Sequence, residues 1–369
     1  MRAPAIIIRM GFSKRKLEQI LCFILLVWMS CACSNLGATQ TAVPTEIETA
    51  ETGWYDIYFT RPDDKQAASY RGGPDEPLAK AIEEAHLSVD VAAHQLNLWS
   101  LRDALLAAAR RGVTVRMVVE SDFMDEPEIG QLKAAGIPVL GDRRESTMHN
   151  KFVIIDRVEV WTGSLNFTVS DVYRNNNNLI RIRSAPMAAN YTAEFNEMFE
   201  QDLFGDKTLP QTPYPSVTIN NTQIEIYFSP DDGTAAEIIR HIQGARESIH
   251  FLAFSFTSDD IASAMLAKAA EGVSVAGVFE SSQVGSNIGG EFVLMREAGL
   301  DVRLDGNPRN MHHKVIIIDE GTVITGSYNF SANAEKRNDE NTLVIHDPAI
   351  AAQFMAEFAR IFQEAQVNQ

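Results

Sequence analysis

The chain has 369 residues, of which 45% are hydrophobic and 22% charged, a balance typical of a globular protein that buries a sizeable core. At this length two domains are expected. The formal net charge of -17 argues against a protein that coats nucleic acid or an anionic membrane, because both kinds of binding depend on Lys and Arg. Any site for an anion must therefore be local.

The first 33 residues have the three-part layout of a secretory signal. Basic residues at 14–16 precede the apolar run ILCFILLVWM, which small residues follow. This run is shorter than the roughly 20 residues that a membrane-spanning helix needs. Cleavage before Cys33 would leave an N-terminal cysteine, so the segment resembles a bacterial lipoprotein signal, although Ser30 and Cys31 depart from the usual pattern. An exported protein is expected, either a cell-envelope lipoprotein with its lipid on Cys33 or a secreted protein, with an uncleaved anchor as the remaining alternative.

Residues 34–53 follow the signal and are rich in Thr, Ala and Glu, without an apolar period. Such a composition is typical of a flexible tether. No cysteine occurs after Cys33, so no intramolecular disulfide is expected in the folded part.

The rest of the chain is an internal repeat. DIYFTRPDD at residue 56 matches EIYFSPDD at residue 225, and AAARRGVTVRMVVES at 107 matches AKAAEGVSVAGVFES at 267. Within each half, runs rich in Val and Ile alternate with segments of helical period, which predicts an α/β fold with a sheet flanked by helices. A constant offset of 163 residues relates three pairs of positions: Gly136 and Gly299, His149 and His312, Gly163 and Gly326.

The two repeats are predicted over residues 54–205 and 222–369. Between them, residues 206–221 contain several Pro, Thr and Asn residues and indicate a linker. Homologous halves in one chain usually pack about a pseudo-two-fold axis, as in a symmetric dimer, so equivalent residues should face each other. A monomer with an internal pseudo-dimer is expected.

Each half carries the same set of polar residues. His149 and Lys151 are two residues apart, as are His312 and Lys314, so each pair points to one face of a strand. An Asp, a Gly-Ser pair and an Asn follow at the same distances in both halves: Asp156, Ser164 and Asn166 in the first, Asp319, Ser327 and Asn329 in the second. If the two motifs meet at the axis, one pocket holds two imidazoles, two ammonium groups, two hydroxyls and two carboxamides.

Such a pocket suits a phosphodiester. Lysines and Asn donors can hold the non-bridging oxygens on which charge grows in the transition state. One histidine can attack phosphorus, and the other can protonate the leaving oxygen and then activate water. This scheme requires neither a metal nor a cofactor.

The spacing H-x-K-x4-D-x6-G-S-x-N, present twice in register, resembles the phospholipase D superfamily. The resemblance extends over residues 55–362 and implies two α/β domains around one shared active site, a phosphohistidine intermediate and no metal. In such enzymes an acidic residue after the second motif orients the histidine of the first half, and here Glu340 occupies that place. Its counterpart in the first half is Asn177, a candidate substrate-binding residue. This asymmetry favours His149 as nucleophile and His312 as acid and base.

Several residues near the motifs keep two interpretations. Asp156 and Asp319 end apolar strands, so turn formation and a direct catalytic role are equally favoured. His313 points away from the face of its neighbour and is expected to be structural, whereas His94 is expected in the core or in the pocket wall. The run Asn175 to Asn178 is expected at the pocket edge.

Basic residues are concentrated between Arg143 and Arg183, a stretch that contains seven Arg and Lys residues but only four Asp and Glu residues. Lys336 and Arg337 add to them near the second motif. A solvated surface and an electrostatic funnel toward the pocket are both compatible with this cluster.

The substrate is left open among phosphodiesters. Export, a lipid anchor and an acidic body favour a phospholipase D that hydrolyses phospholipid headgroup esters and associates with a membrane. Trp99 and residues 283–292 are candidates for the apolar rim that this would need. The alternative enzyme is an exported, metal-independent endonuclease, which the net charge disfavours, and a non-enzymatic binding module fits poorly with two complete motifs. A transferase that uses an alcohol in place of water would have the same pocket.

Overall fold

The computed structural model describes residues 53–365, and these form one compact unit. The predicted signal, Cys33 and the tether up to residue 52 lie outside the described residues. No helix within 53–365 is both long enough and apolar enough to cross a membrane.

The first half forms a seven-stranded sheet in the order β1-β7-β6-β5-β2-β3-β4. Strands β2, β3 and β4 are parallel, and the remaining neighbours are antiparallel. The strands are β1 (Tyr55–Phe59), β2 (Ser88–Ala93), β3 (Thr114–Val119), β4 (Val139–Gly141), β5 (Lys151–Ile155), β6 (Glu159–Gly163) and β7 (Asn178–Arg183). The helices are α2 (Asp75–Glu83), α3 (Trp99–Arg110), α4 (Pro127–Ala134), α5 (Val169–Tyr173) and α6 (Ala185–Gln201), with short 3-10 turns at Ala67–Ser69, Ser121–Phe123 and Gly205–Lys207.

The second half repeats this topology. Its sheet has the order β12-β11-β10-β13-β14-β15-β9-β8, in which seven strands match those of the first half and β8 is added at one edge. The strands are β8 (Ser216–Ile219), β9 (Thr222–Ser229), β10 (Ser248–Ala253), β11 (Ser274–Phe279), β12 (Asp301–Leu304), β13 (Lys314–Ile318), β14 (Thr322–Gly326) and β15 (Glu340–His346). The helices are α7 (Thr234–Gly244), α8 (Asp259–Ala270), α9 (Ser281–Ser286), α10 (Phe292–Glu297), α11 (Ala332–Lys336) and α12 (Pro348–Glu364). The predicted duplicated α/β architecture is therefore confirmed.

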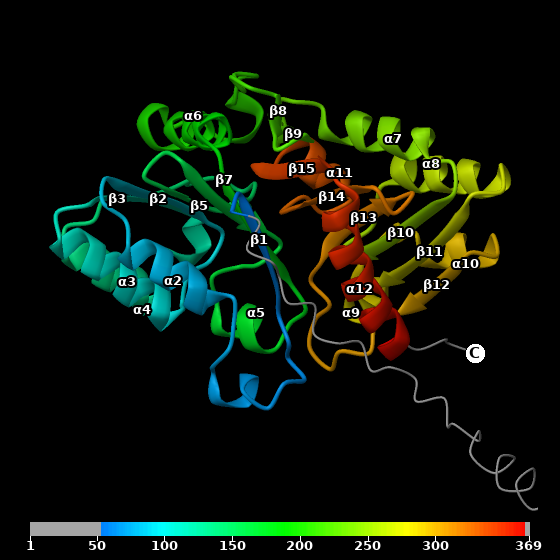
Figure 1. The fold of residues 1–369 in the computed structure, drawn as a ribbon, viewed down its shortest axis with the longest axis horizontal. Helices are drawn as coiled ribbons and strands as arrows, with labels where there is room; N and C mark the ends of the chain where they lie inside the picture. Colours follow the sequence, from blue (N-terminus) through cyan, green and yellow to red (C-terminus); the bar gives the residue numbers. More distant parts are fainter. Residues whose placement is uncertain (1–52, 366–369) are drawn as a thin grey trace, which may run out of the picture. The chain divides into compact units, whose positions relative to one another are not determined.

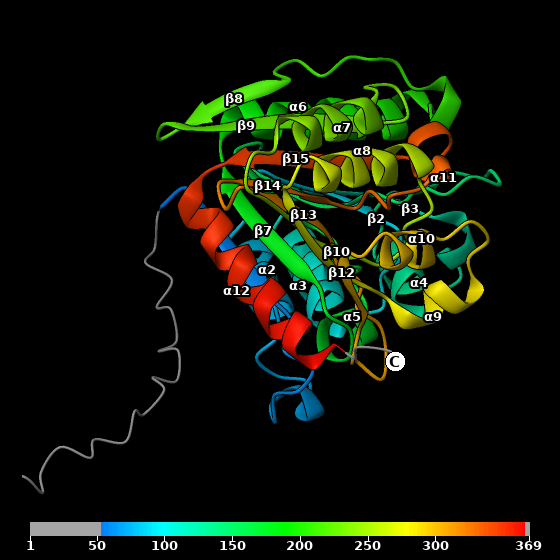
Figure 2. The ribbon, with the colours of Figure 1, turned by 90° about the vertical axis from the view of Figure 1, so that its right-hand side faces the viewer.

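Helices cover both sheets and leave one shared core between the halves. Figure 1 shows α2, α3 and α4 on the outer side of the first sheet and α7, α8 and α10 on the outer side of the second. On the inner side, Tyr191 and Phe195 of α6 join Phe354 and Phe358 of α12 in one hydrophobic cluster with residues of both sheets. Figure 2 shows α12 as one long helix beside the strands. The central strands β5 and β13 are buried along their whole length, which explains their unbroken apolar sequences. This packing fixes the starts of β5 and β13, where the motifs lie.

The predicted linker is partly wrong. Residues 216–219 of the segment form β8, which pairs with β9 through a two-residue turn at Asn220 and Asn221. Both asparagines have positive φ, the conformation that a tight hairpin requires and that Asn tolerates well. Val217 is buried in the shared core, so the alternation of the sequence SVTI outweighs the surrounding Pro and Thr residues.

Gly163, at the end of β6, lies where two strands approach closely. Its φ is +153°, and a Cβ atom built on it would overlap the backbone carbonyl oxygen of Asn178. That oxygen belongs to β7 and cannot move without disturbing the strand pairing. We expect Gly163→Ala to lower the free energy of unfolding by about 2 kcal/mol or more.

Gly130 provides the matched control for this prediction, because it lies in α4 with open space around the position of its missing Cβ. Gly130→Ala should leave the free energy of unfolding unchanged or raise it by up to about 1 kcal/mol. Urea denaturation of the two variants measures the difference. Equal stability of both would contradict the proposed clash.

Candidate active site

The two motifs start at equivalent strands and are each tied to the opposite half. The backbone N–H of His149 donates to the carbonyl of Asp339, and that of His312 donates to the carbonyl of Asn176, at 3.0 and 2.8 Å. These bonds cross between the halves in both directions. Each histidine is therefore held beside the strand that carries its partner, which is Glu340 on β15 or Asn177 directly before β7.

Glu340 lies against His149, 2.7 Å from Oε2 to Nδ1, and it is completely buried. Burial raises the pKa of Glu340, and the ammonium groups of Lys151 and Lys314 act in the opposite direction. Burial also lowers the pKa of His149, to which the same two lysines add. With Glu340 ionised, the proton of the neutral imidazole is on Nδ1, so the lone pair of Nε2 is free to act as a nucleophile.

His312 has a different partner. Its Nδ1 lies 2.9 Å from Oδ1 of Asn177, which also accepts from the Ser164 hydroxyl at 2.9 Å. Asp171 stands directly behind: its Oδ1 is 3.4 Å from the same Nδ1 and accepts from Nδ2 of Asn177 at 3.1 Å. The sequence comparison missed Asp171, because its counterpart at the 163-residue offset is Ala334 and the acidic residue in the first half has moved six positions. Each histidine thus has a carboxylate nearby, directly bonded only for His149.

The two motif lysines are buried, and each is bound by the backbone of its own motif. Lys151 and Lys314 each donate to the carbonyl of the motif histidine two residues earlier, at 2.7 and 2.8 Å. Burial lowers the pKa of Lys151 to about 8, while the carboxylates of Glu340 and Asp171 raise it. The same influences act on Lys314, whose pKa is also lowered by the charge of Lys151. Two cations so close together form a site for an anion with more than one negatively charged oxygen.

Equivalent rings lie against the two motif histidines. The ring of His94 lies 4.9 Å from that of His149, and the ring of Phe254 lies 4.5 Å from that of His312. The ammonium of Lys314 lies 4.8 Å from the centroid of Phe254. Burial lowers the pKa of His94, so it is neutral at physiological pH. His94 therefore lies in the candidate active site, against the ring of His149.

The predicted substrate-binding residues fall into two groups. Ser164 and Ser327 accept backbone N–H groups from Asn178 and Asn341, so their hydroxyls fix the strands that carry Asn177 and Glu340. In contrast, the side-chain oxygens of Asn166 and Asn329 are buried and have no hydrogen-bond partner within residues 53–365. Unsatisfied buried amides of this kind are available to a ligand.

The structure does not bring Asp156 and Asp319 to the site, which removes them from the predicted catalytic set. They follow the far ends of β5 and β13, about 16 Å from the motif lysines at 3.3 Å per residue. Asp156 accepts backbone N–H groups from His86, Leu87 and Ser88, and Asp319 accepts the equivalent three from residues 246–248. They stabilise the entry to β2 and β10, as the turn interpretation of the sequence proposed.

Asp156→Asn should therefore reduce stability and leave kcat unchanged. Burial opposes ionisation of Asp156, but the three backbone donors outweigh it and hold its pKa below the ordinary value. A group with a lowered folded-state pKa stabilises the protein above its unfolded pKa and loses this effect as the pH falls through the folded pKa. We expect the free energy of unfolding of Asp156→Asn to be about 1–3 kcal/mol below that of the unaltered protein at pH 7. This difference should become smaller toward low pH, and denaturation at several pH values measures it. A fall in kcat with unchanged stability would contradict a structural role.

His313 is structural, as its position in the strand predicts. It is fully buried, with Nδ1 3.1 Å from Nδ2 of Asn178 and Nε2 3.2 Å from Glu357. Its counterpart in the first half, Asn150, makes the equivalent contacts to Asn341 and Glu194. Because an Asn replaces it in the other half, its task is hydrogen bonding across the interface.

Most arginines of the basic cluster between Arg143 and Arg183 form ion pairs with carboxylates. Arg143 pairs with Asp202, Arg144 with Asp339, and Arg181 with Asp56 and Glu159. Paired guanidinium groups contribute little to the field in the pocket, so these residues do not form a funnel. The positive charge of the site comes from its two buried lysines.

Comparison with known proteins agrees with this geometry. A family profile described as "Cardiolipin synthase, PLD-like domain" matches residues 78–199 and 238–362, one stretch in each half. The chain is 34% identical over 160 residues to "Phospholipase D" of Rickettsia bellii, covering 42% of this chain and 79% of that protein. It is 33% identical over 133 residues to the human "Mitochondrial cardiolipin hydrolase", covering 36% of this chain and 52% of that protein.

A solved structure matches both halves together. The phosphatidylserine synthase of Haemophilus influenzae Rd KW20 covers 86% of this chain and 88% of its own, with a TM-score of 0.63 and 15% identity. At that identity the likeness concerns the fold alone, and it extends over the paired arrangement of the two sheets. With both halves matched by the family profile, the chain belongs to the phospholipase D superfamily of phosphodiesterases.

Proposed function

We propose that this protein hydrolyses the headgroup phosphodiester of a phospholipid through a phosphohistidine on His149. The observation that carries the proposal is the unequal pairing of the two histidines. His149 has a direct carboxylate partner at 2.7 Å, whereas His312 contacts the amide of Asn177 at 2.9 Å. A carboxylate stabilises the positively charged imidazole ring that forms when Nε2 bonds to phosphorus, whereas an amide only fixes the tautomer.

The first step transfers the phosphoryl group to the enzyme. Nε2 of His149 attacks phosphorus while the bond from phosphorus to the headgroup oxygen breaks. His312 enters this step with protons on both ring nitrogens and gives the one on Nε2 to that oxygen. Lys151 and Lys314 stabilise the charge on the non-bridging oxygens. The headgroup alcohol leaves, and phosphatidyl-His149 remains.

The second step releases phosphatidic acid. His312, now neutral, takes a proton from water as its oxygen attacks phosphorus, and the bond to Nε2 of His149 breaks. Both histidines return to their starting state. Residues of the chain carry every proton in these steps.

Exposed apolar side chains support a lipid substrate. Trp99 is 59% exposed at the start of α3, five residues after His94, whose ring contacts His149. Ile288 is 98% exposed beside Asn287, whose amide donates to Ser255, the neighbour of Phe254, and the ring of Phe254 contacts His312. Both side chains follow closely in sequence after residues that contact the motif histidines, and membrane-facing rims use exposed apolar side chains of this kind. The names of the Rickettsia and human relatives also favour a phospholipid.

The test compares two substrates in parallel. Purified protein, with His149→Ala and His312→Ala as controls, is assayed against phosphatidylcholine vesicles and single-stranded DNA in excess chelator. Choline release that persists in chelator and is lost in both variants is expected. DNA cleavage with intact lipid would overturn the lipid assignment and make the protein a nuclease, the disfavoured alternative.

We also propose export and lipid attachment at Cys33, on the sequence of residues 1–33 alone. A lipid anchor would keep the enzyme at a membrane that contains its substrate. Mass spectrometry of the N-terminus should find lipid on Cys33, and Cys33→Ser should move the protein from the membrane fraction to the soluble one. A mature protein that retains residue 1 would contradict this proposal.

A further inference from the structure

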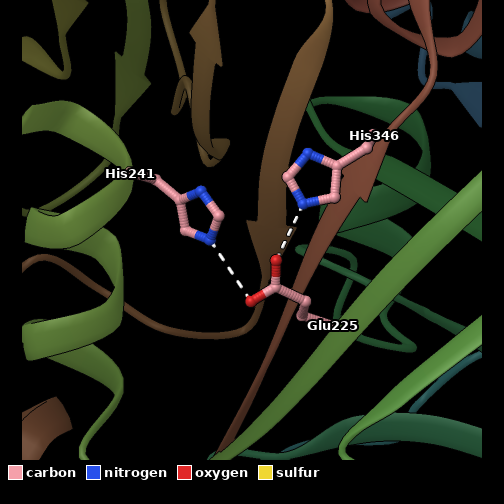
Figure 3. A group of neighbouring side chains, drawn as sticks. All are labelled: Glu225, His241 and His346. Atoms are coloured by element: carbon pink, nitrogen blue, oxygen red, sulfur yellow. Dashed lines mark hydrogen bonds and ion pairs between the residues drawn. The ribbon is translucent and has the colours of Figure 1, made fainter. Parts of the chain in front are cut away.

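Three potential metal ligands meet at the edge of the second sheet, away from the active site. Glu225 of β9, His241 of α7 and His346 of β15 offer ligand atoms that all lie within 4.8 Å of one another. Figure 3 shows the two imidazole rings on either side of the carboxylate, each with one nitrogen directed at an oxygen. The separations are 2.8 Å from Nε2 of His346 to Oε1 and 3.4 Å from Nε2 of His241 to Oε2.

These separations suit a tetrahedral ion. Two ligands bound to zinc at about 2.0–2.1 Å are about 3.3 Å apart, and the two observed values lie on either side of that figure. The other ring nitrogen of His346 is 3.1 Å from the hydroxyl of Thr322, the kind of outer contact that fixes the orientation of a ligating imidazole. Little movement is needed to bring three ligands onto one ion.

The side chain of Arg240 contacts two of the three potential ligands. The guanidinium of Arg240 contacts Oε2 of Glu225 at 2.8 Å and Nε2 of His241 at 2.9 Å. Because arginine can only donate, the Nε2 atom of His241 presents its lone pair toward a positive charge. The Arg240 side chain is 54% exposed, so it can move into solvent and make room for another cation. The Tyr227 hydroxyl also donates to Oε2 of Glu225, at 2.5 Å, and would remain as an outer contact of that ligand.

The first half fills the equivalent place with fixed charges. There Asp56 corresponds to Glu225 and Arg183 to His346, and Arg181 and Arg183 pair with Glu159 and Asp56. Guanidinium groups neutralise a carboxylate permanently and are poor metal ligands. The second half therefore differs from its duplicate in having an imidazole, His346, where the first has the guanidinium of Arg183.

We propose that Glu225, His241 and His346 bind a divalent transition-metal ion of the zinc class, which displaces Arg240. Two imidazoles and one carboxylate are a ligand set that zinc accepts, with water at the remaining position. The ion would join α7 to β9 and β15. Since Glu340 begins and His346 ends the seven-residue β15, the ion would be about 20 Å from the active site and serve stability.

The experiment measures binding and stability of the full chain. Protein stripped with chelator is titrated with Zn²⁺ by calorimetry and with Co²⁺ by its visible absorption, and the melting temperature is recorded with and without Zn²⁺. We expect one ion per chain, a tetrahedral Co²⁺ spectrum and a higher melting temperature with metal. Thr322→Val removes only an outer contact and should weaken Zn²⁺ binding by about 10–100-fold. His346→Ala and Glu225→Gln each remove a ligand and should weaken Zn²⁺ binding by more than that.

Two further variants make the result decisive. Arg240→Ala should bind Zn²⁺ more tightly than the unaltered protein, because no cation has to be displaced. His86→Ala, an exposed histidine outside the group, should bind as the unaltered protein does. The proposal would be overturned if neither the unaltered protein nor Arg240→Ala formed a one-to-one complex with Zn²⁺. It would also be overturned if His346→Ala and His86→Ala weakened Zn²⁺ binding equally. Phosphodiesterase activity in chelator is a separate readout, so the two proposals can fail independently.

Discussion

Replacing His149 by alanine is expected to lower kcat by roughly 10⁴-fold or more on every phosphodiester substrate, because the variant lacks the proposed nucleophile of the first step. The loss should be the same for a phospholipid and for a nitrophenyl ester of phosphocholine, whose leaving group needs no proton. Steady-state and rapid-mixing kinetics on both substrates measure it.

His312→Ala provides the contrast. On the phospholipid it should be as inactive as His149→Ala, since the leaving headgroup is not protonated. On the nitrophenyl ester it should release about one equivalent of nitrophenol in a burst and then stop, because water is not activated for the second step. A burst from His149→Ala instead would exchange the roles of the two histidines.

Glu340→Gln is expected to lower kcat by about 10²–10⁴-fold with little change in stability, because Gln cannot stabilise a positively charged His149. It should also alter the pH dependence. Burial lowers the pKa of Lys151 to about 8, so kcat/KM should fall above that pH as the ammonium loses its charge. Glu340 raises this pKa, so its removal should move the alkaline limb of kcat/KM to lower pH.

Asp171→Asn is the matched control for Glu340→Gln. The Asp171 carboxylate also raises the pKa of Lys151, but less than Glu340 does, and it lies 3.4 Å from His312 without the direct bond that Asn177 makes. Its removal should shift the alkaline limb less and lower kcat less than Glu340→Gln. An equal or larger loss for Asp171→Asn would mean that His312, with Asp171, is the nucleophilic pair.

The duplicated fold was predictable because its signals are local and occur twice. Unbroken apolar runs in residues 151–155 and 314–318 mark buried central strands, and the constant offset fixes their equivalence. β8 was missed because the turn at Asn220 and Asn221 was counted as linker composition instead of as a hairpin signal. The alternation in SVTI was short, and only packing in the shared core decides such cases.

The site was predictable where the duplication itself carried information. The difference between Glu340 and Asn177 at equivalent positions identified the partner of each histidine. The role of Asp171 could not be predicted from the repeat. This residue lies six positions before Asn177, and its equivalent in the second half is Ala334, which has no carboxylate. The distance of Asp156 from Lys151 follows from the length of the five-residue strand between them. The spacing in the sequence already implied this distance, but membership in the repeated motif suggested a catalytic role.

The position of the phosphoryl group on the enzyme tests the account most directly. His312→Ala is mixed with a nitrophenyl ester carrying ³²P, quenched in alkali and digested, and the labelled peptide is sequenced. We expect one acid-labile label on the peptide that contains His149. A label on the peptide of another residue in the unaltered protein, or no covalent label in either protein while turnover continues, would contradict a phosphohistidine at His149.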